Sequence, residues 1–570
     1  MAKRKKRAPS RQMSELRQSL RHTFGLERLR SGQDDVIKSV LDGTDTLAIM
    51  PTGAGKSLCY QLPALHLEGT TIIVSPLISL MKDQVDKLQE HGLEALQVNS
   101  ALPAPEQRSA LGRIEQEESD FVFTTPERLS DPEFLATLRG AKIDFVVIDE
   151  AHCISHWGHD FRPAYLAIRS ALEELSNPPV LALTATATEN VVDDIMQQLG
   201  RPNMRIFNTG IFRPNLQFEV EHVSGDAEKQ GELLRLLEEI QGDGIVYTAT
   251  VKHVEEITKF LQEEGFEVLA YHGRLNARRR KEAQERFMAG ELEAIVATNA
   301  FGMGIDRPDI RFVVHYDLPA SLEAYYQDAG RGGRDGEPAR CVLLYDGRDR
   351  RTHLFLMGGR YPSSEQLSQV YRGLSEAEAG PTGVSTRDLQ AQLPDVAKTK
   401  VRVALGGLKE EGIIDEPRAG RWSLVDRGVS EEGLAELAQQ WKERSESDRE
   451  KLERMEAYAR SALCRWRLLH EYFGEDMPEE RCQTCDNCRR GLAQLAERPI
   501  ASAEAKPKQN EIADTETKLN IGDQVSLPRY GSGRVAEIGD DALVVSFPDG
   551  KNRKFKREFA RPISRSRQKM

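Results

Sequence analysis

The chain has 570 residues, of which 39% are hydrophobic, and a formal net charge of −12. This length predicts several domains with packed cores, and the absence of a long apolar run argues against a membrane span or a membrane partner. The negative net charge does not exclude a nucleic-acid partner, because such binding depends on local charge.

The first informative segment is a glycine-rich turn, Met50-Pro-Thr-Gly-Ala-Gly-Lys-Ser57. It follows an expected buried strand, 45–50, and precedes a run with helical spacing. Such a turn closes around phosphate oxygens, while Lys56 supplies charge and Ser57 can hold Mg²⁺. Met50 replaces the first glycine of the general pattern, as in the shorter loop of helicase-type ATPases. The predicted ATP contacts are Thr52, Gly53, Ala54, Gly55, Lys56 and Ser57. The alternative is a glycine-rich turn without a ligand.

A pair of acids follows the expected strand 145–148, in the segment Asp149-Glu-Ala-His152. The carboxyl ends of parallel strands meet at one edge of a sheet, so both carboxylates would lie beside the phosphate loop. We expect Asp149 to hold Mg²⁺ and Glu150 to orient and deprotonate the attacking water, with His152 in the same catalytic segment. The alternative is two solvated acids that cap a strand.

A second α/β domain with a parallel sheet is predicted further along the chain. The expected strands are 244–247, 267–271, 294–298, 312–316 and 341–345, with helical segments such as 251–264 between them. This domain has no phosphate loop, but its segment 327–336 contains Arg331 and Arg334. These arginines could reach the γ-phosphate across a cleft, so that hydrolysis would require domain closure. The alternative is a pair of solvated surface arginines.

Four of the seven cysteines predict a structural zinc site. Cys464 is followed after 17 residues by Cys482, Cys485 and Cys488, which form two CxxC steps. Four thiolates spaced in this way can enclose one tetrahedral Zn²⁺ and leave no open position for chemistry. The remaining cysteines, Cys59, Cys153 and Cys341, are interpreted as reduced thiols. An odd total without a signal peptide favours a reducing cytoplasm over a disulfide framework.

The order of these motifs resembles the RecQ family of superfamily-2 DNA helicases, from Phe24 to Tyr345. The specific marks are Phe24-Gly25 with Arg30-Ser-Gly-Gln33, Thr125-Pro-Glu-Arg-Leu129, and Cys153-Ile-Ser-His-Trp-Gly-His-Asp-Phe-Arg-Pro163. The resemblance implies two RecA-like domains and Mg²⁺-dependent ATP hydrolysis that drives 3′ to 5′ movement on single-stranded DNA. It also assigns Arg30, Gln33 and Asp306 to the nucleotide site, with Gln33 reading adenine through its amide.

The segment 155–163 resembles the family's aromatic-rich loop, which couples bound single-stranded DNA to hydrolysis. Trp157 and Phe161 can each stack on a base for about 1–3 kcal/mol, and Arg162 can bind a phosphate or a ring face. The alternative is a pair of buried aromatic rings. Leu26 and Leu29 stand where the family often has aromatic residues, so weaker adenine selectivity is expected.

The C-terminal part departs from the usual family order. Segment 360–430 predicts two helices and a hairpin, as in a winged helix, but it precedes the zinc module. Trp422 in this segment is either a core residue or a strand-separating wedge. Residues 519–562 predict a small β-barrel of SH3 or Tudor shape. It is similar to the tail of UvrD/PcrA-type helicases, which is implicated in RNA polymerase contact; the alternative is a barrel that helps to hold DNA.

The predicted fold class is α/β, with two RecA-like parallel-sheet motor domains followed by a winged-helix-like domain, a helical zinc module and a small β-barrel. The predicted order is a basic tail 1–13, motor domains 14–205 and 206–352, the winged-helix-like domain 360–430, the zinc module 445–492, a linker 493–518, the barrel 519–562 and a basic tail 563–570.

The predicted function is an ATP-dependent 3′–5′ DNA helicase in repair or recombination, in a bacterial-type cytoplasm and associated with the nucleoid. It would use ATP, Mg²⁺ and Zn²⁺ and bind single-stranded and duplex DNA, partly through its basic tails. Two alternatives remain open. One is an RNA helicase, and the other is a nucleic-acid-binding adaptor or translocase that does not unwind.

Overall fold

The structure is a computed structural model that divides into two compact units, 1–498 and 499–570. The described residues of the first unit are 9–155, 157–158, 160–302, 307–358, 362–377, 383–418, 420–425, 428–477 and 479–496. Those of the second are 524–527, 531–539, 542–546, 552–556 and 561–562. Asp306, the C-terminal tail 563–570 and most of the predicted linker lie outside them. No helix among the described residues is long and apolar enough to cross a membrane.

The first motor domain is a seven-stranded parallel sheet in the order β3-β4-β2-β5-β6-β1-β7. Its strands are β1 (Thr46–Ile49), β2 (Thr70–Val74), β3 (Ala95–Val98), β4 (Phe121–Thr124), β5 (Ile143–Ile148), β6 (Val180–Thr184) and β7 (Arg205–Asn208). Apolar clusters cover both faces, as a parallel sheet requires. Only β6 separates β1 from β5, so the phosphate loop and the acid pair leave the sheet close together.

The helices of this domain are α1 (Pro9–Phe24), α2 (Gln33–Leu41), α3 (Leu58–Ala64), α4 (Ile78–Glu90), α5 (Ala104–Glu115), α6 (Pro126–Leu129), α7 (Pro132–Gly140), α8 (Ile168–Glu174) and α9 (Glu189–Gln198). Because α1 begins at Pro9, part of the segment expected to be a basic tail is helical.

The second motor domain is a six-stranded parallel sheet in the order β10-β11-β9-β12-β13-β8. Its strands are β8 (Leu216–His222), β9 (Gly244–Tyr247), β10 (Val268–Tyr271), β11 (Ala294–Ala297), β12 (Phe312–His315) and β13 (Ala339–Tyr345). Its helices are α10 (Asp226–Glu239), α11 (Val251–Glu263), α12 (Ala277–Met288), α13 (Leu322–Ala329) and α14 (Asp349–Gly358). The five predicted strands are confirmed, and β8 is an additional edge strand.

A small module follows, with helices α15 (Ser364–Glu376), α16 (Thr386–Gln392) and α17 (Lys398–Glu410). Its antiparallel sheet has the order β14-β16-β15, with β14 (Val384–Ser385), β15 (Ile414–Arg418) and β16 (Arg421–Leu424). Trp422 packs against this core and donates from Nε1 to Thr386 Oγ1 at 2.8 Å, which favours the core interpretation of this residue.

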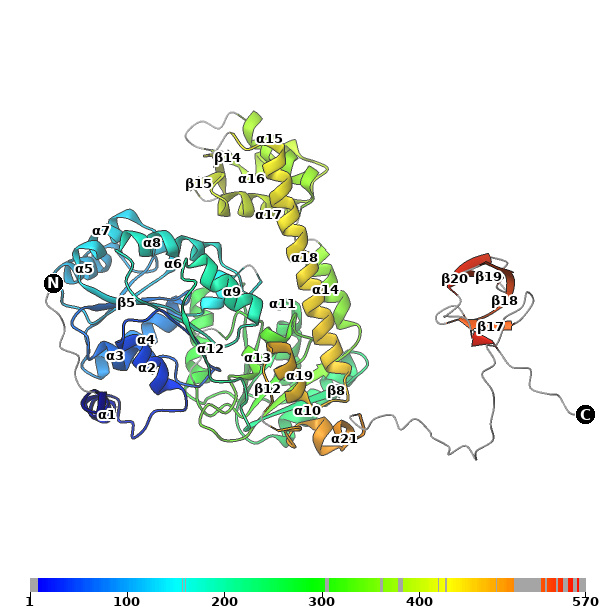
Figure 1. The fold of residues 1–570 in the computed structure, drawn as a ribbon, viewed down its shortest axis with the longest axis horizontal. Helices are drawn as coiled ribbons and strands as arrows, with labels where there is room; N and C mark the ends of the chain where they lie inside the picture. Colours follow the sequence, from blue (N-terminus) through cyan, green and yellow to red (C-terminus); the bar gives the residue numbers. More distant parts are fainter. Residues whose placement is uncertain are drawn as a thin grey trace, which may run out of the picture. The chain divides into compact units, whose positions relative to one another are not determined.

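The long helix α18 (Glu431–Arg460) joins this module to the second motor domain (Figure 1). Beyond it lie α19 (Arg465–Phe473), α20 (Asp486–Arg489) and α21 (Leu492–Ala496), which carry the zinc-binding cysteines or follow them.

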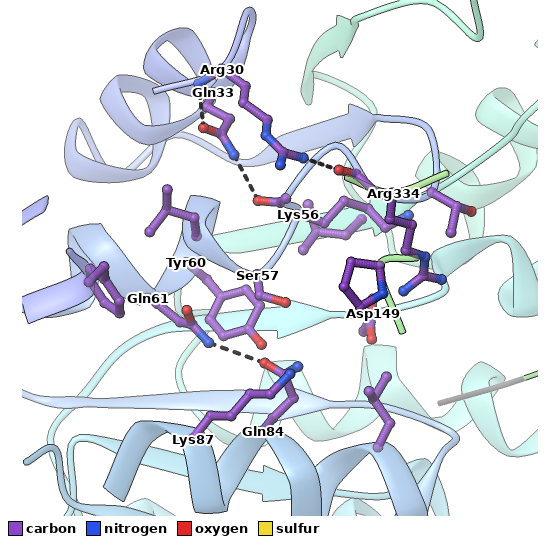
Figure 2. A pocket seen from close by; sticks show the side chains of 18 of the residues that line it. Arg30, Gln33, Lys56, Ser57, Tyr60, Gln61, Gln84, Lys87, Asp149 and Arg334 are labelled. Atoms are coloured by element: carbon purple, nitrogen blue, oxygen red, sulfur yellow. Dashed lines mark hydrogen bonds between the residues drawn. The ribbon is translucent and has the colours of Figure 1, made fainter. Parts of the chain in front are cut away.

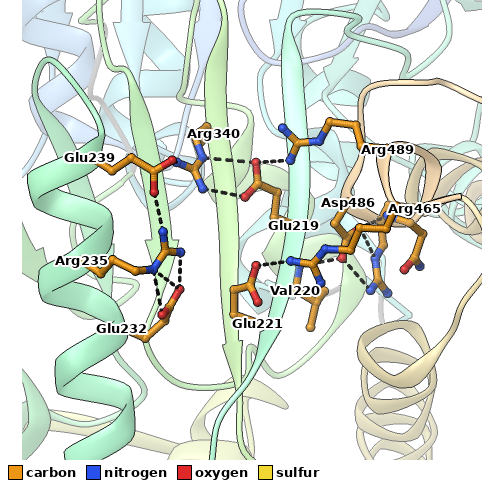
Figure 3. Close-up of polar contacts among 12 residues, drawn as sticks. Glu219, Val220, Glu221, Glu232, Arg235, Glu239, Arg340, Arg465, Asp486 and Arg489 are labelled. Carbon is orange, nitrogen blue, oxygen red and sulfur yellow. Dashed lines mark hydrogen bonds and ion pairs between the residues drawn. The ribbon is translucent and has the colours of Figure 1, made fainter. Parts of the chain in front are cut away.

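The cysteine-bearing segment docks on the edge strand β8 through buried charges (Figure 3). Asp486 accepts from Arg465 Nε at 2.9 Å and Nη2 at 3.0 Å, and from the Val220 N–H at 3.1 Å. Glu219 accepts from Arg340 at 2.8 Å and from Arg489 at 2.6 Å. Because Asp486 and Arg465 are each 2% exposed, neither charge can exchange its partner for water.

The second unit contains a five-stranded antiparallel sheet in the order β20-β19-β18-β17-β21. Its strands are β17 (Gln524–Leu527), β18 (Gly531–Ile538), β19 (Ala542–Ser546), β20 (Asn552–Lys556) and β21 (Arg561–Pro562). A small apolar cluster holds the sheet, formed by Val525, Val535, Leu543 and Val545.

Removing the buried carboxylate at the β8 junction should be costly. Asp486→Ala leaves the Arg465 guanidinium buried without its partner, so we expect a loss of about 3–5 kcal/mol in the free energy of unfolding. Glu221→Ala is the control, because it removes a more exposed acid that pairs with Arg490 at 2.6 Å, and it should cost less than about 1 kcal/mol. Urea denaturation measures both, and equal costs would contradict the docking role.

Candidate functional site

A pocket of about 550 Å³ lies where the two motor domains meet (Figure 2). The first domain contributes the phosphate loop and both acids, and the second contributes its two candidate arginine fingers. The predicted site residues that line it are Arg30, Gln33, Thr52, Gly53, Gly55, Lys56, Ser57, Asp149, Glu150, Arg331 and Arg334. The structure therefore brings together residues separated by some three hundred positions in the sequence.

The phosphate loop has the backbone that its glycines make possible. Gly53 has φ +84° and Gly55 has φ +81°, both in the left-handed region that favours glycine. A Cβ on Gly53 would lie 3.3 Å from Arg334 Cγ, so the loop and the second domain approach closely. Lys56 Nζ donates to the Met50 carbonyl at 3.3 Å, and burial lowers the pKa of Lys56. Anionic phosphates beside this ammonium would favour its charged form again.

The acid pair stands at the end of β5 in a strained turn. Burial, with the neighbouring Glu150 charge, raises the pKa of Asp149 to about 7. A divalent cation at this carboxylate would offset that cost. Glu150 has φ 49° and ψ 46°, a left-handed conformation that is uncommon outside glycine and concentrates at functional sites. His152 Nδ1 lies 3.1 Å from Thr184 Oγ1 and 3.4 Å from Glu150 Oε2. His152 therefore links the Glu150 carboxylate to Thr184 at the end of β6.

Gln33 and Arg30 contact the phosphate loop itself. The Gln33 amide donates to the carbonyl oxygens of Ala54 at 3.1 Å and Gly55 at 2.9 Å, and it accepts from the Arg30 N–H at 2.7 Å. The Arg30 guanidinium donates to the Gly53 carbonyl. Adenine recognition by Gln33 stays a prediction. Leu26 lines the pocket, and it is 44% exposed.

The two arginines of the second domain face the phosphate loop. Arg331 is 5% exposed, donates to the Gly302 carbonyl and lies 3.6 Å from Asp328. Its Nε has no hydrogen-bond partner among the described residues, so this buried donor is available to a ligand. Both side chains line the pocket, as the finger hypothesis requires.

The sequence did not predict a role for Arg213, which joins the phosphate loop to the glycine-rich loop around Arg331. Its guanidinium donates to four carbonyl oxygens, those of Thr52 at 3.3 Å, Gly330 at 2.6 Å, Gly332 at 2.8 Å and Gly333 at 2.6 Å. Thr52 belongs to the phosphate loop, and the three glycines surround Arg331. The only signal in the sequence is its place in Arg213-Pro-Asn215, between the two domains.

The segment between the domains is also held by the cysteine-bearing region. Glu475 accepts from Asn208 Nδ2 at 2.9 Å and from the Ile211 N–H at 2.9 Å, on either side of Gly210 with φ +79°. Phe212 packs edge-on against Trp466, with ring centroids 5.0 Å apart. Glu475 thus spans the turn that links the two motor domains.

The four predicted zinc ligands converge. The Sγ atoms of Cys464, Cys482, Cys485 and Cys488 all lie within 4.8 Å of one another. Tetrahedral Zn²⁺ with Zn–S bonds of about 2.3 Å places its sulfurs about 3.8 Å apart, which fits this cluster. Backbone N–H groups of Cys482 and Cys485 donate to neighbouring sulfurs at 3.4 and 3.3 Å, which favours thiolates.

The three predicted DNA contacts share one loop but differ in accessibility. Trp157 is 49% exposed. The Phe161 ring lies under the Arg444 guanidinium, 4.7 Å from the ring centroid. Arg162 donates to Asp160 Oδ2 at 2.9 and 3.1 Å and to the Pro76 carbonyl at 3.3 Å. The structure therefore supports an exposed stacking ring at Trp157 and shows that a cation covers one face of Phe161.

Comparisons with known families agree with this architecture. The first motor domain matches the DEAD/DEAH box helicase family over residues 30–195, and the second matches the helicase conserved C-terminal domain over residues 228–336. A crystal structure of the DUF1998 helicase MrfA bound to DNA has the same fold, with a TM-score of 0.51 and 19% identity over 74% of this chain and 63% of that one. The fold and pocket define a two-domain helicase-type ATPase.

Residues 425–489 match the RecQ zinc-binding family. The chain is 34% identical over 486 residues to the ATP-dependent DNA helicase RecQ of Synechocystis, covering 83% of this chain and 98% of that protein. It is also 41% identical over 368 residues to the probable ATP-dependent DNA helicase RecS of Bacillus subtilis, covering 64% and 74% of the two chains. The chain belongs to the RecQ family of ATP-dependent DNA helicases.

The RecQ of Bacillus subtilis is 48% identical over 345 residues, covering 59% of this chain and 57% of that protein. The chain thus spans little more than half the length of that relative.

Zinc removal should unfold the cysteine-bearing segment, because the free energy of metal binding by the four converging cysteines contributes directly to folding. We expect chelation to lower the melting temperature and to expose Trp466, which is fully buried. Differential scanning calorimetry and tryptophan fluorescence measure these changes, with re-added Zn²⁺ as the control. Unchanged melting after complete metal removal would contradict a structural zinc.

Loss of the Arg213 guanidinium should leave the glycine carbonyls around Arg331 unsupported. We expect Arg213→Gln to lower kcat for ATP hydrolysis by about tenfold or more, which corresponds to about 1.4 kcal/mol. The KM for ATP should change little, because the phosphate loop itself stays intact. Arg205→Gln, which removes an exposed arginine from β7, is the matched control. A change in KM alone would argue against positioning of the fingers.

Proposed function

We propose that this chain is an ATP- and Mg²⁺-dependent DNA helicase that moves 3′ to 5′ on single-stranded DNA and separates duplex strands in repair or recombination. The observation that carries the proposal is the pocket in which the phosphate loop of one domain meets Arg331 and Arg334 of the other. Such a pocket is complete only when the domains approach, so ATP binding and release can drive a step along a strand.

The roles in hydrolysis follow from chemistry and position. Lys56 and the loop amides would bind the phosphates, and Ser57 and Asp149 would hold Mg²⁺. Glu150 would activate the attacking water, with His152 fixing its position. Arg331 and Arg334 would stabilise charge in the transition state. Arg30 and Gln33 would bind the adenosine end, and Asp306 is proposed for the same site from the family resemblance.

DNA is preferred over RNA as the substrate. The RecQ relatives from Bacillus subtilis and Synechocystis are named DNA helicases, and residues 425–489 match the RecQ zinc-binding family. Trp157 offers an exposed ring for stacking on a base, and Phe161 and Arg162 stand beside it on the same loop. A decayed adaptor is disfavoured because Lys56, Glu150 and Arg334 converge on one pocket.

We propose that the module at 360–430 is a winged helix that binds duplex DNA. Helices α16 and α17 lie between β14 and the hairpin β15–β16 of a three-stranded antiparallel sheet, and this arrangement supports the assignment. Lys398 and Arg402 are both exposed on α17, four residues apart on one face, where they can reach phosphates. Trp422 is assigned to its core and not to a wedge.

We propose the remaining parts from their composition and strand pattern. The C-terminal sheet would form a Tudor- or SH3-like barrel that contacts RNA polymerase, or else helps to hold DNA, and the basic tails would neutralise phosphates. The domain limits are proposed as predicted from the sequence. A bacterial-type cytoplasm, in association with the nucleoid, is the proposed location.

Strand separation on matched substrates tests this function. DNA and RNA duplexes with a 3′ or a 5′ single-stranded tail are incubated with ATP and Mg²⁺, and Lys56→Ala is the control. Only the 3′-tailed DNA should be unwound, and Lys56→Ala should neither hydrolyse ATP nor unwind, because the phosphates lose their buried cation.

The other outcomes point to the alternatives. Preference for the RNA duplex would make the chain an RNA helicase. DNA-stimulated hydrolysis without unwinding would make it a translocase, and absence of hydrolysis would favour an adaptor. Hydrolysis that persists in Lys56→Ala would contradict the assigned pocket.

A further inference from the structure

Helix α18 has 30 residues and therefore extends over about 45 Å. Its two ends are anchored by apolar packing. Leu434, Leu437, Ala438 and Trp441 belong to the core of the module formed by α15–α17. Leu452, Met455, Tyr458 and Ala459 belong to a core shared with the second motor domain and the cysteine-bearing segment. The helix is thus fixed to both of these parts (Figure 1).

The middle of α18 differs from its ends, because residues 442–451 are all polar or charged. Two cations of this stretch, Arg444 and Lys451, reach the aromatic-rich loop of the first motor domain. Arg444 lies over the Phe161 ring at 4.7 Å, and Lys451 Nζ donates to the carbonyl oxygens of Trp157 at 2.7 Å and Gly158 at 3.4 Å. Seven residues apart, these cations lie on one face of the helix.

We propose that Arg444 and Lys451, together with the aromatic-rich loop, form a binding site for the phosphate backbone of single-stranded DNA. Without DNA, the same two side chains hold this loop against α18. The proposal rests on the proposed helicase function and adds two residues on a separate element to its DNA site. When single-stranded DNA enters, Arg444 and Lys451 would give up their contacts with the loop and bind DNA phosphates instead.

The magnitudes favour this exchange. A base stacked on an aromatic side chain generally contributes more binding free energy than a cation over a ring near the surface. A base can therefore displace Arg444 from Phe161. The released guanidinium then lies beside the backbone of the nucleotide that displaced it, where charge-assisted hydrogen bonds to phosphate replace the lost contact.

The contact of Arg444 and Lys451 with the aromatic-rich loop would respond to movement of the two motor domains. The loop belongs to the first motor domain, whereas α18 is rooted in the second through its apolar C-terminal half. Arg444 and Lys451 contact the loop through a cation–π pair and hydrogen bonds, which can break without opening a core. Domain movement and DNA entry would therefore act on the same contact.

Other cations on this stretch provide a matched control. Lys442 lies 4.0 Å from Glu446, and Arg449 lies 4.0 Å from Glu453, within the helix itself. Both are more than 60% exposed. The variant Lys442→Gln/Arg449→Gln therefore removes the same charge from the same helix as Arg444→Gln/Lys451→Gln, but not from the face that meets the loop.

The experiment measures binding of the full chain to a fluorescent oligothymidine over a range of salt concentrations, and ATP hydrolysis without DNA. In Arg444→Gln/Lys451→Gln the slope of log K against log salt should fall by about 1.4, which corresponds to two lost phosphate contacts on a single strand. Hydrolysis without DNA should rise above that of the control variant, because the loop is no longer held. Equal melting temperatures show that both variants fold.

If Arg444→Gln/Lys451→Gln has the same slope of log K against log salt as the control variant, the phosphate site is overturned. If the two variants hydrolyse ATP equally without DNA, the proposed hold of α18 on the loop is overturned. Failure of the proposed function is a separate result. In that case the unmodified chain itself would show no DNA-stimulated hydrolysis.

Discussion

The contact between the phosphate loop and the glycine-rich loop around Arg331 is the constraint on which the rest of the structure depends. Arg213 makes this contact by donating to carbonyl oxygens of both loops. A guanidinium has five donors in a rigid fork and no acceptor, so it can bind several carbonyls at once and hold them in one geometry. Burial lowers the pKa of Arg213, but the carbonyl dipoles around it favour the charged form.

This contact is supported from outside the motor domains. The segment that carries Arg213 is tied to the cysteine-bearing region through Glu475 and Trp466, and that region is fixed to β8 through Asp486. Zn²⁺ bound by the four cysteines would therefore order the elements that hold the segment between the two motor domains. Helix α18 adds a second link from the same region to the aromatic-rich loop. The proposed nucleotide, DNA and zinc sites are thereby connected through short chains of packed and hydrogen-bonded residues.

The sequence predicted the parts of the site whose chemistry is local. The phosphate loop and the acids follow apolar strands, and the four cysteines have a ligand spacing, so a short window of residues was enough to find each. It did not reveal Arg213, Glu475 or the partners of α18, because these residues act through contacts between distant segments. β8 was also missed, since its buried Glu219 interrupts the apolar pattern of a parallel strand and is tolerated only through Arg340 and Arg489. Such pairings appear only once the fold is known.

The central claim is that one nucleotide pocket is shared by two domains that pivot near Gly210. The most direct test is the distance between spin labels at Glu106→Cys in the first domain and Glu264→Cys in the second, both exposed positions, measured by pulsed electron resonance. The distance distribution should shift and narrow when a non-hydrolysable ATP analogue and single-stranded DNA bind, and it should return with ADP. A distribution unaffected by nucleotide in a chain that hydrolyses ATP would contradict the central claim.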